Sequence, residues 1–230
     1  WNNHIRNADF GFARADLGDH LDVNFKTLVA SNGPRHVVFP DPGNDGTPAA
    51  WGGVEAVWLG ATVDTEGNGQ PTTGATGDDA NPSAIDDEDG ADIDGMTWSG
   101  LNLQLPVTVS SSGAPTGQLY VAAWIDWNAN GIFDATEMYK VPVSLGSNTL
   151  SLAAPSTFQD YDPSLEIRLR LYAGDPGLPS PVGLVVNGEV EDYVRGVSPT
   201  GITLAAIGAT VQGDAIEVTW DTASEIDNLG

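Results

Sequence analysis

The sequence predicts an all-β protein, an antiparallel β-sandwich with long acidic calcium-binding loops. Apolar and polar residues alternate in several short segments, which is typical of half-buried strands. The chain of 230 residues also contains 28 glycines and 15 prolines, which favours many turns and little helix. In addition, residues 126–137 fit the calcium-loop pattern D-x-[DN]-x-[DN]-G-x5-E at every fixed position.

The predicted strands lie mainly in the second half of the chain. In chain order they fall within residues 101–109, 119–125, 138–143, 145–152, 165–172 and 182–194. The alternation is cleanest in residues 165–172, whereas residues 119–125 are apolar enough to indicate a buried strand. Pro142 suits a strand end or an edge, and a turn is expected at residues 146–148.

The remaining segments suggest two units. Residues 1–60 are irregular and contain short apolar pieces. Residues 64–95 are acidic and rich in glycine, and we expect this second segment to order around cations. A boundary at Ser198-Pro199-Thr200-Gly201 separates a domain of residues 1–197 from a tail of residues 198–230. The tail contains two strand candidates, residues 202–207 and 215–220, which are too few for an independent module.

The loop at residues 126–137 offers oxygen atoms at the spacing that calcium requires. Its candidate ligands are the side chains of Asp126, Asn128, Asn130, Asp134 and Glu137 and the carbonyl of Ile132. Gly131 stands where the loop turns sharply. Strands rather than helices flank the loop, so a bound calcium would serve structure rather than signalling. A polar turn rich in Asp and Asn is the alternative.

Composition excludes several classes of partner. The chain has 32 acidic and 8 basic residues, a formal charge of −24, which argues against nucleic acid and anionic membranes as partners. It has no cysteine, so disulfides and thiolate zinc sites are excluded. No apolar run is long enough to insert into a membrane. Bound cations would relieve the self-repulsion of so acidic a chain.

Several motifs resemble one family. Gly188-Glu189-Val190-Glu191-Asp192-Tyr193 is similar to the signature of the GEVED domain of bacterial secreted and cell-surface proteins. The pattern extends over residues 9–196 and includes the calcium loop and Arg168-Leu169-Arg170. The resemblance implies an extracellular β-sandwich of surface proteins and no established catalytic activity. Asn130 departs from the pattern, because Asp is common there. Residues 216–230 resemble the truncated start of a fibronectin-III-like repeat.

Two further acidic groups belong to the same family pattern. They are Asp86, Asp87, Glu88 and Asp89, and Glu189, Glu191 and Asp192. If the two groups converge, their mutual repulsion calls for a cation. Glu189 and Glu191 alternate to one face of a strand while Val190 is expected to face the core. Asp64 and Glu66 have the same spacing and are weaker candidates. Two solvated loops, or neutralisation by Arg168 or Arg170, remain as alternatives.

These patterns indicate a calcium-stabilised extracellular module with a structural or adhesive role. We expect calcium as its cofactor, a cell-surface location and no enzymatic activity. The tail suggests partners: other copies of the chain or other surface proteins, joined by β-strand addition into a fibre. The alternative is a carbohydrate-binding module, because Trp51, Trp58, Trp124 and Trp127 could stack on glycans. Trp127 alternates between loop ligands and is expected to point outward or cover the loop.

Overall fold

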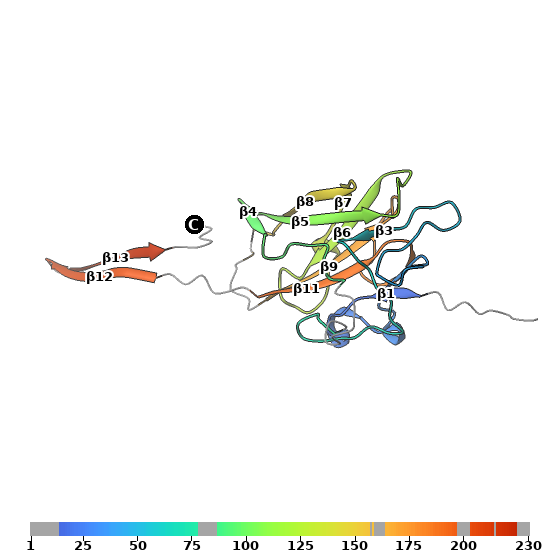
Figure 1. The fold of residues 1–230 in the computed structure, drawn as a ribbon. Coiled ribbons are helices and arrows are strands. Elements are labelled where there is room, and N and C mark those ends of the chain that lie inside the picture. Colours follow the sequence, from blue (N-terminus) through green and yellow to red (C-terminus); the bar gives the residue numbers. More distant parts are fainter. Residues whose placement is uncertain are drawn as a thin grey trace, which may run out of the picture.

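The computed structural model describes residues 14–77, 87–156, 158, 164–196, 203–213 and 215–224, and it confirms the all-β class. Two four-stranded antiparallel sheets form the body of the molecule (Figure 1). The first, the β5 sheet, contains β3 (Val57–Leu59), β4 (Thr97–Ser99), β5 (Asn102–Ser111) and β8 (Gly146–Ala153). The second, the β9 sheet, has the order β11 (Val190–Gly196), β9 (Ser164–Tyr172), β6 (Leu119–Ile125) and β7 (Met138–Val143).

The main core lies between these two sheets, in a sandwich-like arrangement. Alternate apolar residues of β5, such as Leu103 and Leu105, pack in one cluster with Ile167 and Leu169 of β9. The predicted period of two therefore holds on both inner faces. The predicted turn at residues 146–148 is wrong, because these residues pair with β5; the chain turns at Ser144-Leu145 instead.

The outer face of the β9 sheet is also covered, which the sequence did not predict. The N-terminal region supplies β1 (Ala15–Leu17), α1 (Asp22–Phe25), the 3₁₀ turn η1 (Val29–Ser31) and β2 (Pro34–Val37). Strand β2 pairs antiparallel with β1 and parallel with β10 (Gly183–Val186). Phe25 of α1 packs with Trp124 and Tyr172, which point outward from β6 and β9. The fold thus has a third, partial layer.

The tail forms a hairpin of β12 (Thr203–Gln212) and β13 (Ala215–Ser224). In Figure 1 the hairpin lies apart from the sandwich. Five of its large apolar side chains are half or more exposed: Ile207, Val211, Ile216, Val218 and Trp220. Among the described residues, no helix is long and apolar enough to cross a membrane.

Candidate metal centres

The loop between β6 and β7 folds around the side chain of Asp126. Asp126 accepts hydrogen bonds from the main-chain N–H groups of Asn130, at 3.1 Å, and Gly131, at 2.7 Å. These contacts close the turn at the position where Gly131 adopts a φ of 77°. A side chain is strained in that left-handed conformation, which explains the glycine of the pattern.

The other candidate ligands of the loop gather through hydrogen bonds to one another. The Asn128 amide donates to Glu137 at 2.9 Å, and the Asn130 amide donates to Asp134 at 2.9 Å. Glu137 also accepts the N–H of Asp134 in a capping box at the start of the 3₁₀ turn η2 (Ala135–Glu137). The structure therefore brings together all five side chains that the sequence proposed, on one short loop.

Two carboxylates of the loop are buried, Asp126 and Glu137, each with 3% of its surface exposed. Burial raises the pKa of both groups, and the N–H donors of the loop partly oppose the rise. Ile132 is exposed, as a residue that offers its carbonyl rather than its side chain can be. The loop contains anionic and amide oxygens, the donor types that calcium prefers. The amide oxygens of Asn128 and Asn130 accept the N–H groups of Asn130 and Ile132 in this structure.

Trp127 does not point outward from this loop. It is 4% exposed and belongs to the main core, where its ring lies 4.9 Å from that of Phe158. Its indole N–H donates to the hydroxyl of Tyr139 at 2.9 Å. The prediction of an outward side chain was wrong because Trp127 follows β6 directly and continues the inward alternation of Ala123 and Ile125.

A second acidic group forms where segments far apart in the sequence meet. Carboxylate oxygens of Asp16, Glu66 and Asp87 all lie within 4.8 Å of one another. No other group of three His, Asp or Glu residues in the described ranges gathers ligand atoms so closely. Asp16 comes from β1, Glu66 bridges to the neighbouring Ala15, and Asp87 accepts the N–H of Asp64 at 3.3 Å.

These carboxylates are held in place by main-chain donors. Asp16 accepts the N–H of Val190 at 2.6 Å, and Glu66 accepts the N–H of Leu17 at 2.9 Å. Burial raises the pKa of Asp16, and the charge of Asp87 adds to the rise. Burial likewise raises the pKa of Glu66 to about 12, with Asp64 and Asp16 contributing. The ionised forms are thus costly without a cation.

Glu189 and Glu191 continue the acidic group along the edge of the β9 sheet. Glu189 accepts the N–H of Leu59, and Glu191 accepts the N–H of Gly90 at 2.7 Å. Both are fully buried, and burial raises the pKa of Glu189 and, to about 8, that of Glu191. As predicted, the two share one face of the strand, but it is the core face, as the pairing of Glu191 with Leu169 shows.

Val190 therefore points to the opposite face, contrary to the prediction. The sequence reading failed because both faces of β11 are covered, so an apolar residue there does not mark the core side. Of the first acidic run, Asp89 is exposed and accepts the N–H of Ala61 at 2.8 Å, and Glu88 is partly buried. Asp86 lies outside the described residues.

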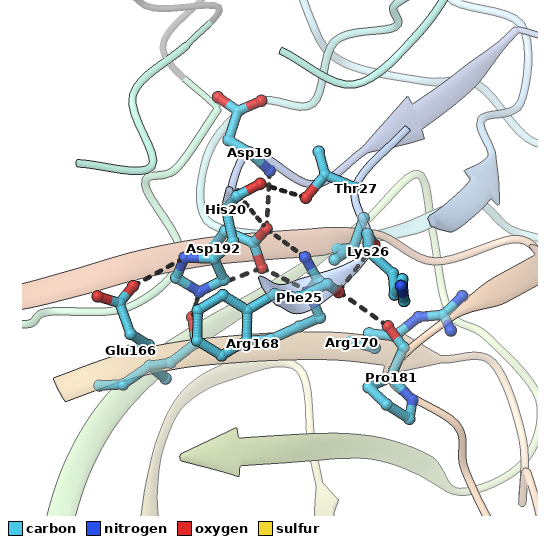
Figure 2. Close-up of polar contacts among 12 residues, drawn as sticks. Asp19, His20, Phe25, Lys26, Thr27, Glu166, Arg168, Arg170, Pro181 and Asp192 are labelled. Atoms are coloured by element: carbon cyan, nitrogen blue, oxygen red, sulfur yellow. Dashed lines mark hydrogen bonds and ion pairs between the residues drawn. The ribbon is translucent and has the colours of Figure 1, made fainter. Parts of the chain in front are cut away.

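Asp192 has a different environment, shown in Figure 2. Both its oxygens accept hydrogen bonds from Arg168, at 2.7 Å each, in a fully buried ion pair. One oxygen also accepts the N–H groups of Asp19, at 2.7 Å, and His20, at 2.9 Å. The positive charge of Arg168 keeps the pKa of Asp192 below its ordinary value despite burial. This is the neutralisation by arginine that the sequence left open, so we remove Asp192 from the candidate ligands.

The strand that carries these residues lies in a segment that matches a known domain family. Residues 120–194 match the family model of the GEVED domain. These residues form a GEVED domain. The match begins in β6, includes the loop of residues 126–137 and ends two residues after Asp192. The part of the predicted range before residue 120 and the fibronectin-III-like repeat lie outside it. No curated protein matches the chain, and no solved structure does.

The signature of the GEVED domain has a physical explanation at each position. Gly188 has a φ of 129°, and a Cβ there would lie 2.0 Å from the carbonyl oxygen of Leu171. Tyr193, the last residue, packs in the main core and accepts the N–H of Ala91 at 3.0 Å. Between them, Glu189 and Glu191 fasten β3 and the segment at residue 90 to the sheet, while Asp192 pairs with Arg168.

Proposed function

We propose that this chain is a calcium-stabilised module with a structural or adhesive role on an extracellular surface. The observation that carries the proposal is the loop of residues 126–137, whose five ligand-type side chains gather on one turn. The GEVED match and the formal charge of −24 support the same function. Calcium would join β6 to β7 at the end of the hairpin and would offset the charge of two buried carboxylates.

The proposed calcium has a structural task. Beside the loop lie strands β6 and β7, so binding has no helix pair to open and no signal to transmit. The affinity expected of extracellular modules is about 0.1–1 mM. In about 10 mM calcium such a site stabilises the fold by about 1.4–2.7 kcal/mol. The melting temperature should then rise by about 3–10 °C for a domain of this size.

Thermal unfolding with calcium and with excess chelator tests the proposal, alongside metal analysis of the purified protein. Asp126→Asn should weaken the response to calcium, because it removes a buried anionic ligand. Asn130→Asp should strengthen it, because it adds a charge at a ligand position. If the melting temperature ignores calcium in the wild type and in both variants, the loop is a polar turn and the proposal fails.

We further propose that the β12–β13 hairpin joins copies of the chain, or the chain and another surface protein, by β-strand addition. Among the described residues, β12 and β13 pair only with each other, which leaves one edge of each strand available, and one face carries exposed apolar residues. An isolated two-stranded hairpin is marginal in water, so a partner that covers this face would stabilise it. Head-to-tail contacts of this kind generate fibres.

A carbohydrate-binding module remains the alternative function, and the placement of the tryptophans favours it less. Trp58, Trp124 and Trp127 are buried and serve packing. Trp51 is 60% exposed and contacts Phe39 edge-on at 5.8 Å between ring centroids. Trp220 is also exposed, but it lies on the hairpin apart from Trp51, so the two rings do not form one stacking surface for a sugar chain. Binding to a glycan array in the presence of calcium would revive this alternative.

A further inference from the structure

The strongest unexplained feature is the negative charge buried between β1, β11 and the segments that contain Glu66 and Asp87. Three carboxylates lie within 4.8 Å of one another, and Asp16 and Asp87 are 1% and 3% exposed. Placing several like charges together in a low-dielectric region is unfavourable unless an opposite charge accompanies them.

A second, independent observation concerns Glu189, which is fully buried. Its Oε1 atom has no hydrogen-bond partner, although its other oxygen accepts the N–H of Leu59. Asp16 accepts the N–H of the adjacent Val190 at 2.6 Å, so the main chain of this segment lies at the same group, and the charges of Glu191, Asp16 and Asp87 raise the pKa of Glu189. A buried carboxylate oxygen without a hydrogen-bond partner, one residue from the main-chain N–H that Asp16 accepts, is available to a cation at this group.

Among the described residues, the ion pairs do not involve three of these carboxylates. Within the described ranges, Asp16, Glu66 and Glu189 form no ion pair with Lys, Arg or His. Arg14 and Arg35 line an open cavity of about 660 Å³ that Glu66 borders, but neither pairs with it. Arg168 is occupied by Asp192 on the opposite face of β11.

We propose that Asp16, Glu66 and Asp87, completed by Glu189, bind a divalent cation at a site separate from the loop of residues 126–137. Carboxylate oxygens from both Asp and Glu side chains suit calcium, because calcium accepts six to eight oxygen ligands in variable geometry. The choice of calcium rests on the proposed function, whereas the existence of the site does not. The ion would fasten β1, residues 64–66 and residues 87–90 to Glu189, which directly precedes β11.

The test counts calcium ions per folded chain by native mass spectrometry after removal of metal and reloading with calcium. The wild type should bind two ions. Glu66→Gln should bind one, since the amide keeps an oxygen for the N–H of Leu17 but loses the charge. Glu137→Gln should also bind one, through loss of the loop site. Asp94→Asn, an exposed carboxylate outside both sites, should still bind two.

The outcomes separate this site from the loop. If the wild type binds one ion and Glu66→Gln keeps it while Glu137→Gln loses it, the second site is refuted and the loop stands. The reverse pattern supports the second site and refutes the loop. If no ion binds, both proposals fail.

A second measurement guards against a merely structural role of Glu66. In the metal-free state, folding must protonate Glu66, which is unfavourable at neutral pH, so Glu66→Gln should raise the melting temperature above that of the metal-free wild type. With calcium present, the same variant should melt lower than the wild type. A substitution that only damages packing would lower the melting temperature in both states, and that result would overturn the proposal.

Discussion

At the scale of single residues, the clearest lesson is how Arg168 and Asp192 neutralise each other. The guanidinium lies over the outer face of the β9 sheet and also donates to the carbonyls of Phe25, at 2.9 Å, and Pro181, at 3.0 Å. A planar arginine fork can satisfy a carboxylate and several carbonyls together, which lysine cannot. The pair thus fixes the N-terminal layer onto β9 and β11 (Figure 2).

Substitution of Asp192 by Asn should therefore destabilise the fold strongly. The variant leaves the buried charge of Arg168 without its partner, and such losses cost about 3–5 kcal/mol. Urea unfolding in saturating calcium measures the cost. Asp175→Asn is the matched control, because Asp175 pairs with Lys140 at 2.8 Å on the exposed surface and should matter little. Equal effects of the two substitutions would contradict the structural role assigned to the buried pair.

At the scale of elements, the strands were largely predictable and the layer over them was not. The predicted segments 119–125 and 138–143 coincide with β6 and β7, because alternation and turn residues mark strands locally. Arg168 and Arg170 occupy polar positions of the alternation in β9, yet both are buried. Their burial depends on residues 14–37 returning to this face, a long-range contact that no local pattern encodes.

Long-range contacts also limited the prediction of the acidic groups. The ligands of the loop follow one another at fixed spacing, so the sequence contains the whole set. Asp16 was not predicted, and Glu66 was only a weaker candidate, because they meet Asp87 through the tertiary fold. A hint was present: three acidic stretches in one folded unit must either diverge or share a counter-ion.

The attachment of β2 to β9 predicts an unusual histidine. His36 of β2 accepts a hydrogen bond from Arg170 Nε at 3.0 Å and lies edge-on to Tyr172. Burial, and then the charge of Arg170, lowers the pKa of His36 well below its ordinary value of 6.5. His36 should stay neutral at pH 5.5, and NMR of its ring carbons and nitrogens would show this directly. Titration of the ring near pH 6.5 would contradict the arrangement.

The lowered pKa of His36 makes the stability of the fold depend on pH. Below pH 6.5 the unfolded chain binds a proton at His36 that the folded protein does not, so stability decreases as pH falls. Between pH 7.5 and 5.5 the loss should approach about 1.4 kcal/mol. Urea unfolding of the wild type and His36→Gln, both in saturating calcium, isolates this contribution as the difference between their pH profiles.

At the scale of the whole molecule, charge and exposed apolar surface act on different regions. The formal charge of −24 makes the chain repel itself when compact, and bound cations would reduce that repulsion. The hairpin instead gathers apolar residues on one face, since the pairs Val211–Ile216 and Ile207–Trp220 lie side by side. Trp220 is 65% exposed, so this face is suited to a contact that the sandwich itself does not provide.

The hairpin yields the prediction that tests assembly. Replacement of Ile207, Val211 and Trp220 by Thr in the full-length chain should abolish self-association, because it removes the apolar face and keeps the strand propensity. Light scattering after size exclusion, at a series of protein concentrations in calcium, measures the assembly.

A control variant changes polar residues of the opposite face, Thr210→Ser and Thr219→Ser, and should associate as the wild type does. The melting temperature of the sandwich should be unchanged in both variants, since the hairpin lies apart from its core. If the wild type is monomeric at every concentration, or if the apolar variant assembles equally well, self-assembly through this face is refuted while both cation sites remain testable.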